Sequence, residues 1–262
     1  MFSPAISEQN ILVEHLMSLT ESLSRIDELQ TQINSLRPLN EAEAASLREY
    51  YKIGLTYSSN ALEGNTLTES ETKVVLEDGL TIGGRPLRDH LEAVGHAAAF
   101  DYVCSLQRST GFSEQDILTL HRLFFCKIQE EQAGVYRGSR IFVTGSAHKF
   151  PSPEEVPALM KEFVEQAPRW REMYHPVEYA ARLHQRLVAI HPFVDGNGRV
   201  ARLLMNLALL QSGHLVTVIP PVLRSEYIET LETSHRHMTP FILFLCRCQI
   251  EAQKEYLRLL KD

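Results

Sequence analysis

The chain reads His191-Pro192-Phe193-Val194-Asp195-Gly196-Asn197-Gly198-Arg199-Val200-Ala201-Arg202 between two segments in which apolar residues recur every three to four positions. This spacing predicts one helix over Val177 to Ile190 and another over Val200 to Leu210, with a glycine-rich turn between them. The free N–H groups at the start of a helix, together with the helix dipole, attract anions. Gly196 and Gly198 let the backbone approach a phosphate closely. The stretch therefore predicts a phosphate-binding turn.

The side chains of the same stretch fit chemistry at a polyphosphate. His191 has an ordinary pKa near neutrality and can act as a general base. Asp195 offers hard oxygen ligands for Mg²⁺. Arg199 and Arg202 are three positions apart, so they share a helical face and can both reach along a polyphosphate. A plain turn around Asn197 is the alternative, but such a turn requires neither the base nor the two arginines.

Composition places the chain among soluble globular proteins. Of its 262 residues, 44% are hydrophobic and 23% are charged, as is usual for that class. The formal net charge of −7 argues against nucleic-acid binding, which usually relies on a basic surface. The N-terminus lacks the pattern of a secretory signal, and the longest apolar run, residues 241–246, is too short to cross a bilayer. We expect a cytoplasmic protein that binds neither nucleic acid nor membrane.

Cysteine and histidine positions give no sign of a metal centre. The four cysteines lack the spacing of zinc ligands, and we expect free thiols in a reducing compartment. Several histidines lie in mostly apolar helical segments, where packed or surface roles are more common than metal ligation. These histidines are His90, His96, His121 and His184.

Helical periodicity continues through most of the chain and predicts an all-α fold. The predicted helices cover residues 11–33, 40–62, 68–78, 87–106, 114–129, 176–190, 200–210, 224–231 and 239–256, and one more helix is predicted to begin at Ser152. Asn40 with Glu43 forms a capping-box pattern, and Ser152 and Thr239 each precede a proline in the manner of helix caps. Residues 134–150 differ, because glycine, serine and β-branched residues there predict a small β-hairpin flap. Residues 216–219 fit a short strand or an extended loop.

Residues 191–202 resemble the signature HPFx[D/E]GNGRxxR of the Fic family of nucleotidyl transferases, and they match every fixed position. Residues 59–65 resemble the family's [S/T]xxxE[G/N] inhibitory motif, in the class whose inhibitory helix precedes the core. Residues 134–137 and 143–146 resemble the family flap. The resemblance implies a Fic-type helical bundle over residues 57–262, with the inhibitory segment at 59–64, and an N-terminal helical region over residues 1–56.

The resemblance also implies a reaction, the transfer of AMP from ATP to a Ser, Thr or Tyr hydroxyl of a target protein with release of pyrophosphate. His191 is then the base. The residues implied to bind ATP and Mg²⁺ are Asp195 (also the metal ligand), Gly196, Asn197, Gly198, Arg199, Arg202 and Tyr227. Glu63 is implied to pair with Arg202 and to misplace ATP in a resting enzyme, although a solvated acid at a helix end is the simpler interpretation.

Other assignments stay open at this point. Tyr227 fits an adenine pocket and a half-buried core position equally well, and Asn206 fits either the nucleotide or plain packing. His235 stands where some relatives have an asparagine near the adenine. The flap residues Thr144, Gly145 and Ser146 could pair with a target segment by strand addition.

Three functions are compatible with the sequence: a self-inhibited adenylyltransferase, a hydrolase that removes AMP with Glu63 orienting the water, and a non-catalytic nucleotide sensor. The complete signature argues against the sensor. The identity of the target, ATP as opposed to another nucleotide donor, and the oligomeric state, with a homodimer among the options, are not determined by the sequence.

Overall fold

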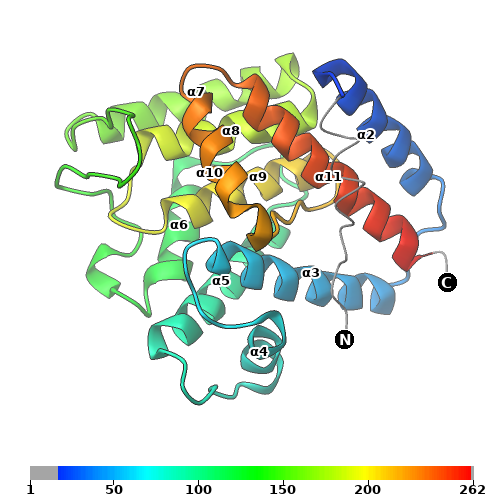
Figure 1. The fold of residues 1–262 in the computed structure, drawn as a ribbon, viewed down its shortest axis with the longest axis horizontal. Coiled ribbons are helices and arrows are strands. Elements are labelled where there is room, and N and C mark those ends of the chain that lie inside the picture. The colour runs from blue at the N-terminus through cyan, green and yellow to red at the C-terminus, as the bar shows by residue number, and fades with distance from the viewer. Residues whose placement is uncertain (1–16, 261–262) are drawn as a thin grey trace.

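The computed structural model describes residues 17–260, and within that range every regular element is a helix (Figure 1). The all-α prediction is confirmed. The α-helices are α2 (Leu19–Asn34), α3 (Glu41–Ala61), α4 (Glu69–Lys73), α5 (Leu87–Ser105), α6 (Glu114–Phe125), α7 (Val156–Met173), α8 (Pro176–Ile190), α9 (Asn197–Gln211), α10 (Arg224–Ser234) and α11 (Thr239–Leu259). One turn of π-helix, Val74–Asp78, continues α4, and two short 3₁₀ helices cover Glu130–Gln132 and Pro221–Leu223.

Helix α9 is the centre of the molecule. Twelve of its fifteen residues are buried, among them the charged Arg199 and Arg202. A helix that is buried on all sides must be surrounded by other helices, and α8, α5, α6 and the end of α3 pack around it. Helix α2 lies along α11 on the outside of this bundle (Figure 1). The start of α9 is thereby held rigidly in the interior.

Local capping signals set several boundaries as the sequence predicts. Asn40 and Glu43 form a complete capping box at the start of α3, and Ser113 caps α6. Gly79 adopts a left-handed conformation, with φ of 66°, where the π-turn after α4 ends. Such caps satisfy backbone groups that the helix itself leaves unpaired.

Three predicted boundaries are wrong, and one predicted helix is interrupted. The helix predicted over residues 11–33 is not continuous, because residues 17 and 18 are not helical and Ser18 forms a capping box with Glu21 at the start of α2; the predicted start near residue 11 lies outside the described range. Helix α6 ends at Phe125 rather than at residue 129. Thr239 is the first residue of α11 and not its cap. Helix α7 begins at Val156 rather than just after Ser152.

Pro157 favours the late start of α7. A proline costs least in the first turn of a helix, because it lacks an N–H and its ring clashes with the carbonyl four residues earlier. A helix starting after Ser152 would place Pro157 beyond that turn and add a second interior proline to Pro168, which α7 already contains. Instead the backbone N–H of Ser152 donates to the Glu155 carboxylate at 2.7 Å, and the intervening residues form a turn.

The predicted β-hairpin flap is absent, since residues 134–150 contain no strand in the described structure. Side chains, rather than a strand ladder, bind the polar backbone of this segment. The Arg137 guanidinium donates to the carbonyls of Ser139 and Pro151 at 2.9 and 2.7 Å, and Glu232 accepts from the backbone N–H of Ala147 at 2.7 Å. Residues 216–219 form an extended loop. None of the described helices combines the length and the apolar character needed to span a bilayer.

Candidate active site

The turn between α8 and α9 is closed by the side chain of Asn197. Its amide oxygen accepts from the backbone N–H of Phe193, and its amide nitrogen donates to the carbonyl of the same residue, each at 2.9 Å. Gly196 just before α9 has φ of 77°, and a Cβ there would lie 3.0 Å from the ring of Phe124. Glycine is therefore required at Gly196 for both conformation and space. Asn197 shapes the loop with its side chain, leaving its backbone for an anion.

His191 ends α8 in a strained conformation. It is the one non-glycine residue with positive φ, 52°, in the described chain. Non-glycine residues rarely adopt this region, and such strain is found preferentially at functional sites. The ring lies edge-on to Phe150 at 5.0 Å between ring centroids. Burial lowers the pKa of His191 to about 4, so the imidazole is neutral at physiological pH and can accept a proton.

Arg137 holds His191 in place from a distant part of the chain. Its Nε donates to the carbonyl of His191 at 2.8 Å, and its own backbone N–H donates to the carbonyl of Pro192 at 2.9 Å. Arg137 is only 2% exposed. Burial of the guanidinium lowers its pKa from the ordinary arginine value. The residue connects the flap segment to the turn, a role that the sequence pattern alone did not indicate.

His121 supports the other side of the turn. The backbone N–H of Gly134 donates to its Nδ1 at 2.9 Å, which leaves the proton on Nε2 to be donated to the carbonyl of Asp195 at 3.1 Å. The ring stacks on Phe193 with centroids 3.8 Å apart. Burial lowers the pKa of His121 to about 4. His121 is thus a packed residue, as expected, and it also fixes the backbone beside the predicted metal ligand.

Asp195 lies within a cluster of charges. Its carboxylate accepts from Arg88 at 2.7 Å, from Arg199 at 3.2 Å and from the backbone N–H of Gly196 at 2.6 Å. Burial raises the pKa of Asp195, but Arg199 and the other donors outweigh it, and the net pKa lies below the usual value. Arg199 also pairs with Glu92 at 3.1 Å. The carboxylate is ionised and 43% exposed, as a metal ligand would need to be.

Arg202 lies about one turn into α9, and its guanidinium is held by several hydrogen bonds. Its guanidinium donates to the hydroxyl and the carbonyl of Ser59 at 2.9 and 2.8 Å, and to the Tyr227 hydroxyl at 3.1 Å. The same Tyr227 hydroxyl bonds His184 Nε2 at 2.9 Å. Tyr227 is 5% exposed. The structure therefore places Tyr227 beneath Arg202, as a buried support for the guanidinium.

Glu63 is a further partner of the Arg202 guanidinium, at the same Nη2 that donates to the Ser59 carbonyl. Its Oε1 lies 2.8 Å from Arg202 Nη2. A Cβ built on Gly198 would lie 2.4 Å from the same oxygen, so the carboxylate occupies the space above the glycine at the start of α9. Burial raises the pKa of Glu63, but Arg202 and Arg199 outweigh burial and hold the net pKa below the usual value. An ionised carboxylate thus lies at the position predicted for an anion.

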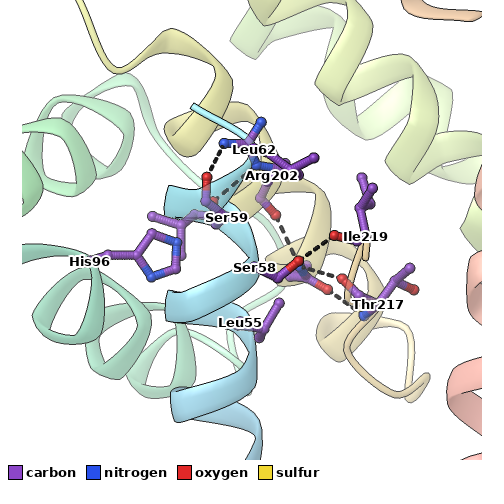
Figure 2. Close-up of a pocket in the computed structure, with 10 residues that line it drawn as sticks. Leu55, Ser58, Ser59, Leu62, His96, Arg202, Thr217 and Ile219 are labelled. Atoms are coloured by element: carbon purple, nitrogen blue, oxygen red, sulfur yellow. Dashed lines mark hydrogen bonds between the residues drawn. The ribbon is translucent and has the colours of Figure 1, made fainter. Parts of the chain in front are cut away.

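The end of α3 is anchored so that Glu63 stays there. Figure 2 shows Ser59 directed at Arg202 and the neighbouring Ser58 directed at the carbonyl of Ile219, to which its hydroxyl donates. Gly64, with φ of 96°, turns the chain away immediately after Glu63. The cavity in this figure, between α3 and α9, measures about 10 Å³. It has room for one water molecule at most and not for a nucleotide base.

The flap tip lies on α10. Ser146 donates from its hydroxyl to Glu232 at 2.8 Å, while Thr144 and Gly145 are exposed. His235, at the end of α10, stacks on His148 with ring centroids 3.8 Å apart. Asn206 is buried and binds the backbone of Thr217 in both directions, which is the packing role.

Comparison with known proteins agrees with this geometry, in which a glycine-containing turn begins a buried helix within an all-helical domain. The profile of the Fic/DOC family matches residues 111–209. The fold is similar to a fragment of Fic-1 from C. elegans, with a TM-score of 0.84 and 31% identity, over 96% of this chain and 75% of that one. It is also similar to a Fic-domain signalling protein from Bacteroides thetaiotaomicron, with a TM-score of 0.81 and 30% identity, over 90% of this chain and 97% of that one. The chain belongs to the Fic family.

A curated relative, the protein adenylyltransferase Fic of Nematostella vectensis, is 36% identical over 245 residues, which make up 90% of this chain and 56% of the relative. The Drosophila melanogaster protein of the same name is 33% identical over 97% of this chain and 52% of its own length. The chain thus spans about half the length of the curated relatives it matches.

Proposed function

We propose that the protein is a self-inhibited protein adenylyltransferase, which transfers AMP from ATP to a hydroxyl side chain of a target protein. The observation that carries the proposal is the position of Glu63, paired with Arg202 and lying over Gly198 at the start of α9. A carboxylate there occupies a site suited to phosphate. The names of the curated relatives support the same activity.

The proposed step is an in-line displacement at the α-phosphorus of ATP. The target hydroxyl oxygen forms the new P–O bond, its proton passes to neutral His191, and the bond to the bridging oxygen breaks to release pyrophosphate. The backbone N–H groups at the start of α9 stabilise the charge on the α-phosphate. Arg199 and Arg202 neutralise the β- and γ-phosphates.

Asp195 is the residue that would hold Mg²⁺. One ionised, partly exposed carboxylate fits the usual mode of magnesium binding, in which one or two carboxylates share the ion with substrate phosphates. The ion would neutralise charge on the phosphates. Arg88, now 2.7 Å from this carboxylate, would have to share it or move.

Inhibition in this proposal is competition for one guanidinium. While Glu63 holds Arg202, the γ-phosphate cannot use that arginine, and ATP binds in a pose unfit for in-line attack. The exposed flap residues Thr144 and Gly145 would receive the target segment next to the reacting phosphate.

Removal of AMP is the second candidate, and the position of the Glu63 carboxylate, where a Cβ on Gly198 would meet it, favours this activity. In the same place, the ionised carboxylate could orient a water molecule toward a phosphodiester held by the start of α9. Both activities fit one site, with Glu63 opposing the first and serving the second.

Labelled nucleotides test the proposal. With Mg²⁺, the Glu63→Gly variant should incorporate label into protein from α-labelled ATP and not from γ-labelled ATP, since the β- and γ-phosphates leave. The Glu63→Gly/His191→Ala variant is the matched control and should incorporate neither label. Incorporation of the γ-label would contradict nucleotidyl transfer and indicate a kinase.

A further inference from the structure

Three metal-ligating side chains meet on the face of the molecule where α2 joins the core. They are Asp27 of α2, His175 just before α8, and His214 in the turn after α9, and one ligand atom of each lies within 4.8 Å of the other two. The group lies apart from the turn between α8 and α9, and it shares no residue with the site described above. Residues 27, 175 and 214 are far apart in sequence, so no sequence motif predicts this group.

The hydrogen bonding of His214 leaves one of its ring nitrogens free to bind a metal. It is 9% exposed, and its Nδ1 lies 3.3 Å from the carbonyl of Ser212. A carbonyl only accepts hydrogen bonds, so Nδ1 carries the proton and Nε2 presents a lone pair. Within residues 17–260 this buried Nε2 has no hydrogen-bond partner. A buried polar atom without a partner is costly and calls for an explanation, and a backbone carbonyl that fixes the tautomer is the usual second-shell feature of a metal-bound histidine.

His175 is held differently. Its Nδ1 accepts from the backbone N–H of Val177 at 3.2 Å, so the proton is on Nε2, which donates to Asp27 Oδ1 at 3.1 Å. Metal binding through Nε2 would move this proton to Nδ1 and end the hydrogen bond from Val177. The rings of His175 and His214 meet edge to face, with centroids 5.9 Å apart. Ligands at 2.0–2.1 Å in a tetrahedral site lie about 3.3 Å from one another. The Asp27–His175 separation of 3.1 Å is close to this value, and the other two separations are within 4.8 Å.

We propose that Asp27, His175 and His214 form a binding site for a zinc-type divalent transition metal. Two imidazoles and one carboxylate are ligands that Zn²⁺ accepts and that Mg²⁺ disfavours. Three protein ligands leave a fourth position for water, and Asp27, with its side chain 63% exposed, places that position toward solvent. Metal binding would replace the hydrogen bonds that His175 makes with Asp27 and Val177 and give Nε2 of His214 a partner. It would also tie α2 to the core beside the existing bond from Gln30 to the carbonyl of Gly213, 3.2 Å.

Calorimetric titration of the metal-free protein with ZnCl₂ tests the site. The wild-type protein should bind one equivalent here, and Zn²⁺ should raise its unfolding temperature, because a ligand that binds only the folded state stabilises it. MgCl₂ at the same concentration should have no such effect. The Asp27→Asn variant should bind Zn²⁺ at this site at least about tenfold more weakly, since an amide is a far poorer ligand.

Asp27→Asn changes an exposed side chain and keeps its size, so we expect this variant to fold. It therefore tests the site even if His214→Ala, at a buried position, fails to fold. His237→Ala removes an exposed histidine elsewhere and is the matched control for adventitious binding. Asp195→Ala controls for binding at the active site. Both controls should retain the wild-type affinity. Equal Zn²⁺ affinity in wild type and Asp27→Asn would overturn the proposal, whatever the outcome of the nucleotide experiments.

Discussion

Replacing Glu63 with glycine should relieve the proposed inhibition of AMP transfer. The structure allows the size of the rate increase to be estimated. The broken contact is a charge-assisted hydrogen bond of 2.8 Å to a guanidinium that is 5% exposed, but Glu63 itself is 37% exposed. Charged hydrogen bonds contribute about 1.5–3 kcal/mol, and solvent screening places this one at the lower end. About 1.4 kcal/mol corresponds to a tenfold change in rate. We therefore expect kcat/KM for AMP transfer to rise at least about tenfold.

Arg202 should remain available after the substitution, because Ser59 and Tyr227 still hold its guanidinium. This is why the loss of Glu63 should activate rather than disorder the site. The assay is the initial rate of label transfer from α-labelled ATP. Glu63→Gly/Arg202→Ala should lose the gain, since no freed arginine remains. A Glu63→Gly rate equal to that of the wild type would refute the reasoning and leave Glu63 as an acid at a helix end.

Three further outcomes are expected. With a pKa of about 4, His191 stays neutral well below pH 6.5. The kcat/KM of Glu63→Gly should therefore be constant from neutral pH down to about 5 and should fall below that pH as the base is protonated. A fall in kcat/KM centred near pH 6.5 would contradict this assignment. Asp195→Ala should abolish Mg²⁺-dependent transfer in a Glu63→Gly background while the protein stays folded, and unchanged Mg²⁺ dependence would leave Asp195 as a turn residue only. Arg137→Met should lower the free energy of unfolding by about 1–3 kcal/mol in urea titration, because it removes the donor from three part-buried hydrogen bonds to carbonyls, and a wild-type midpoint would show that the loop does not depend on this side chain.

Local patterns account for what could be predicted from the sequence. The helices could be predicted from apolar periodicity. Capping boxes such as Asn40 with Glu43 predicted helix starts because the interaction spans only four residues. The chemistry proposed for residues 191–202 could be inferred from the sequence because a helix start brings consecutive residues toward one predicted anion site. The start of α7 was misjudged because Ser152 and Pro153 fit a helix start locally, whereas the structure has a turn over residues 153–155 before the helix begins.

Long-range partners could not be predicted in this way. Arg88 reaches Asp195 from 107 positions away, and Arg137 reaches His191 from 54 positions away. Neither arginine belongs to a pattern with its partner, so only the packed fold brings them together. The flap was misjudged because side chains bind its backbone in place of a strand ladder: Glu232, which lies outside the segment, accepts from Ala147, and Arg137 within the segment donates to nearby carbonyls.

The central claim is that the turn after α8 performs nucleotidyl transfer with His191 as base while Glu63 restrains it. The most direct measurement is the intact mass of the protein and of any added target after incubation with Mg-ATP. We predict that Glu63→Gly adds AMP to protein, wild type adds much less, and Glu63→Gly/His191→Ala adds none. No AMP adduct with Glu63→Gly, or an equal adduct with and without His191, would contradict the claim.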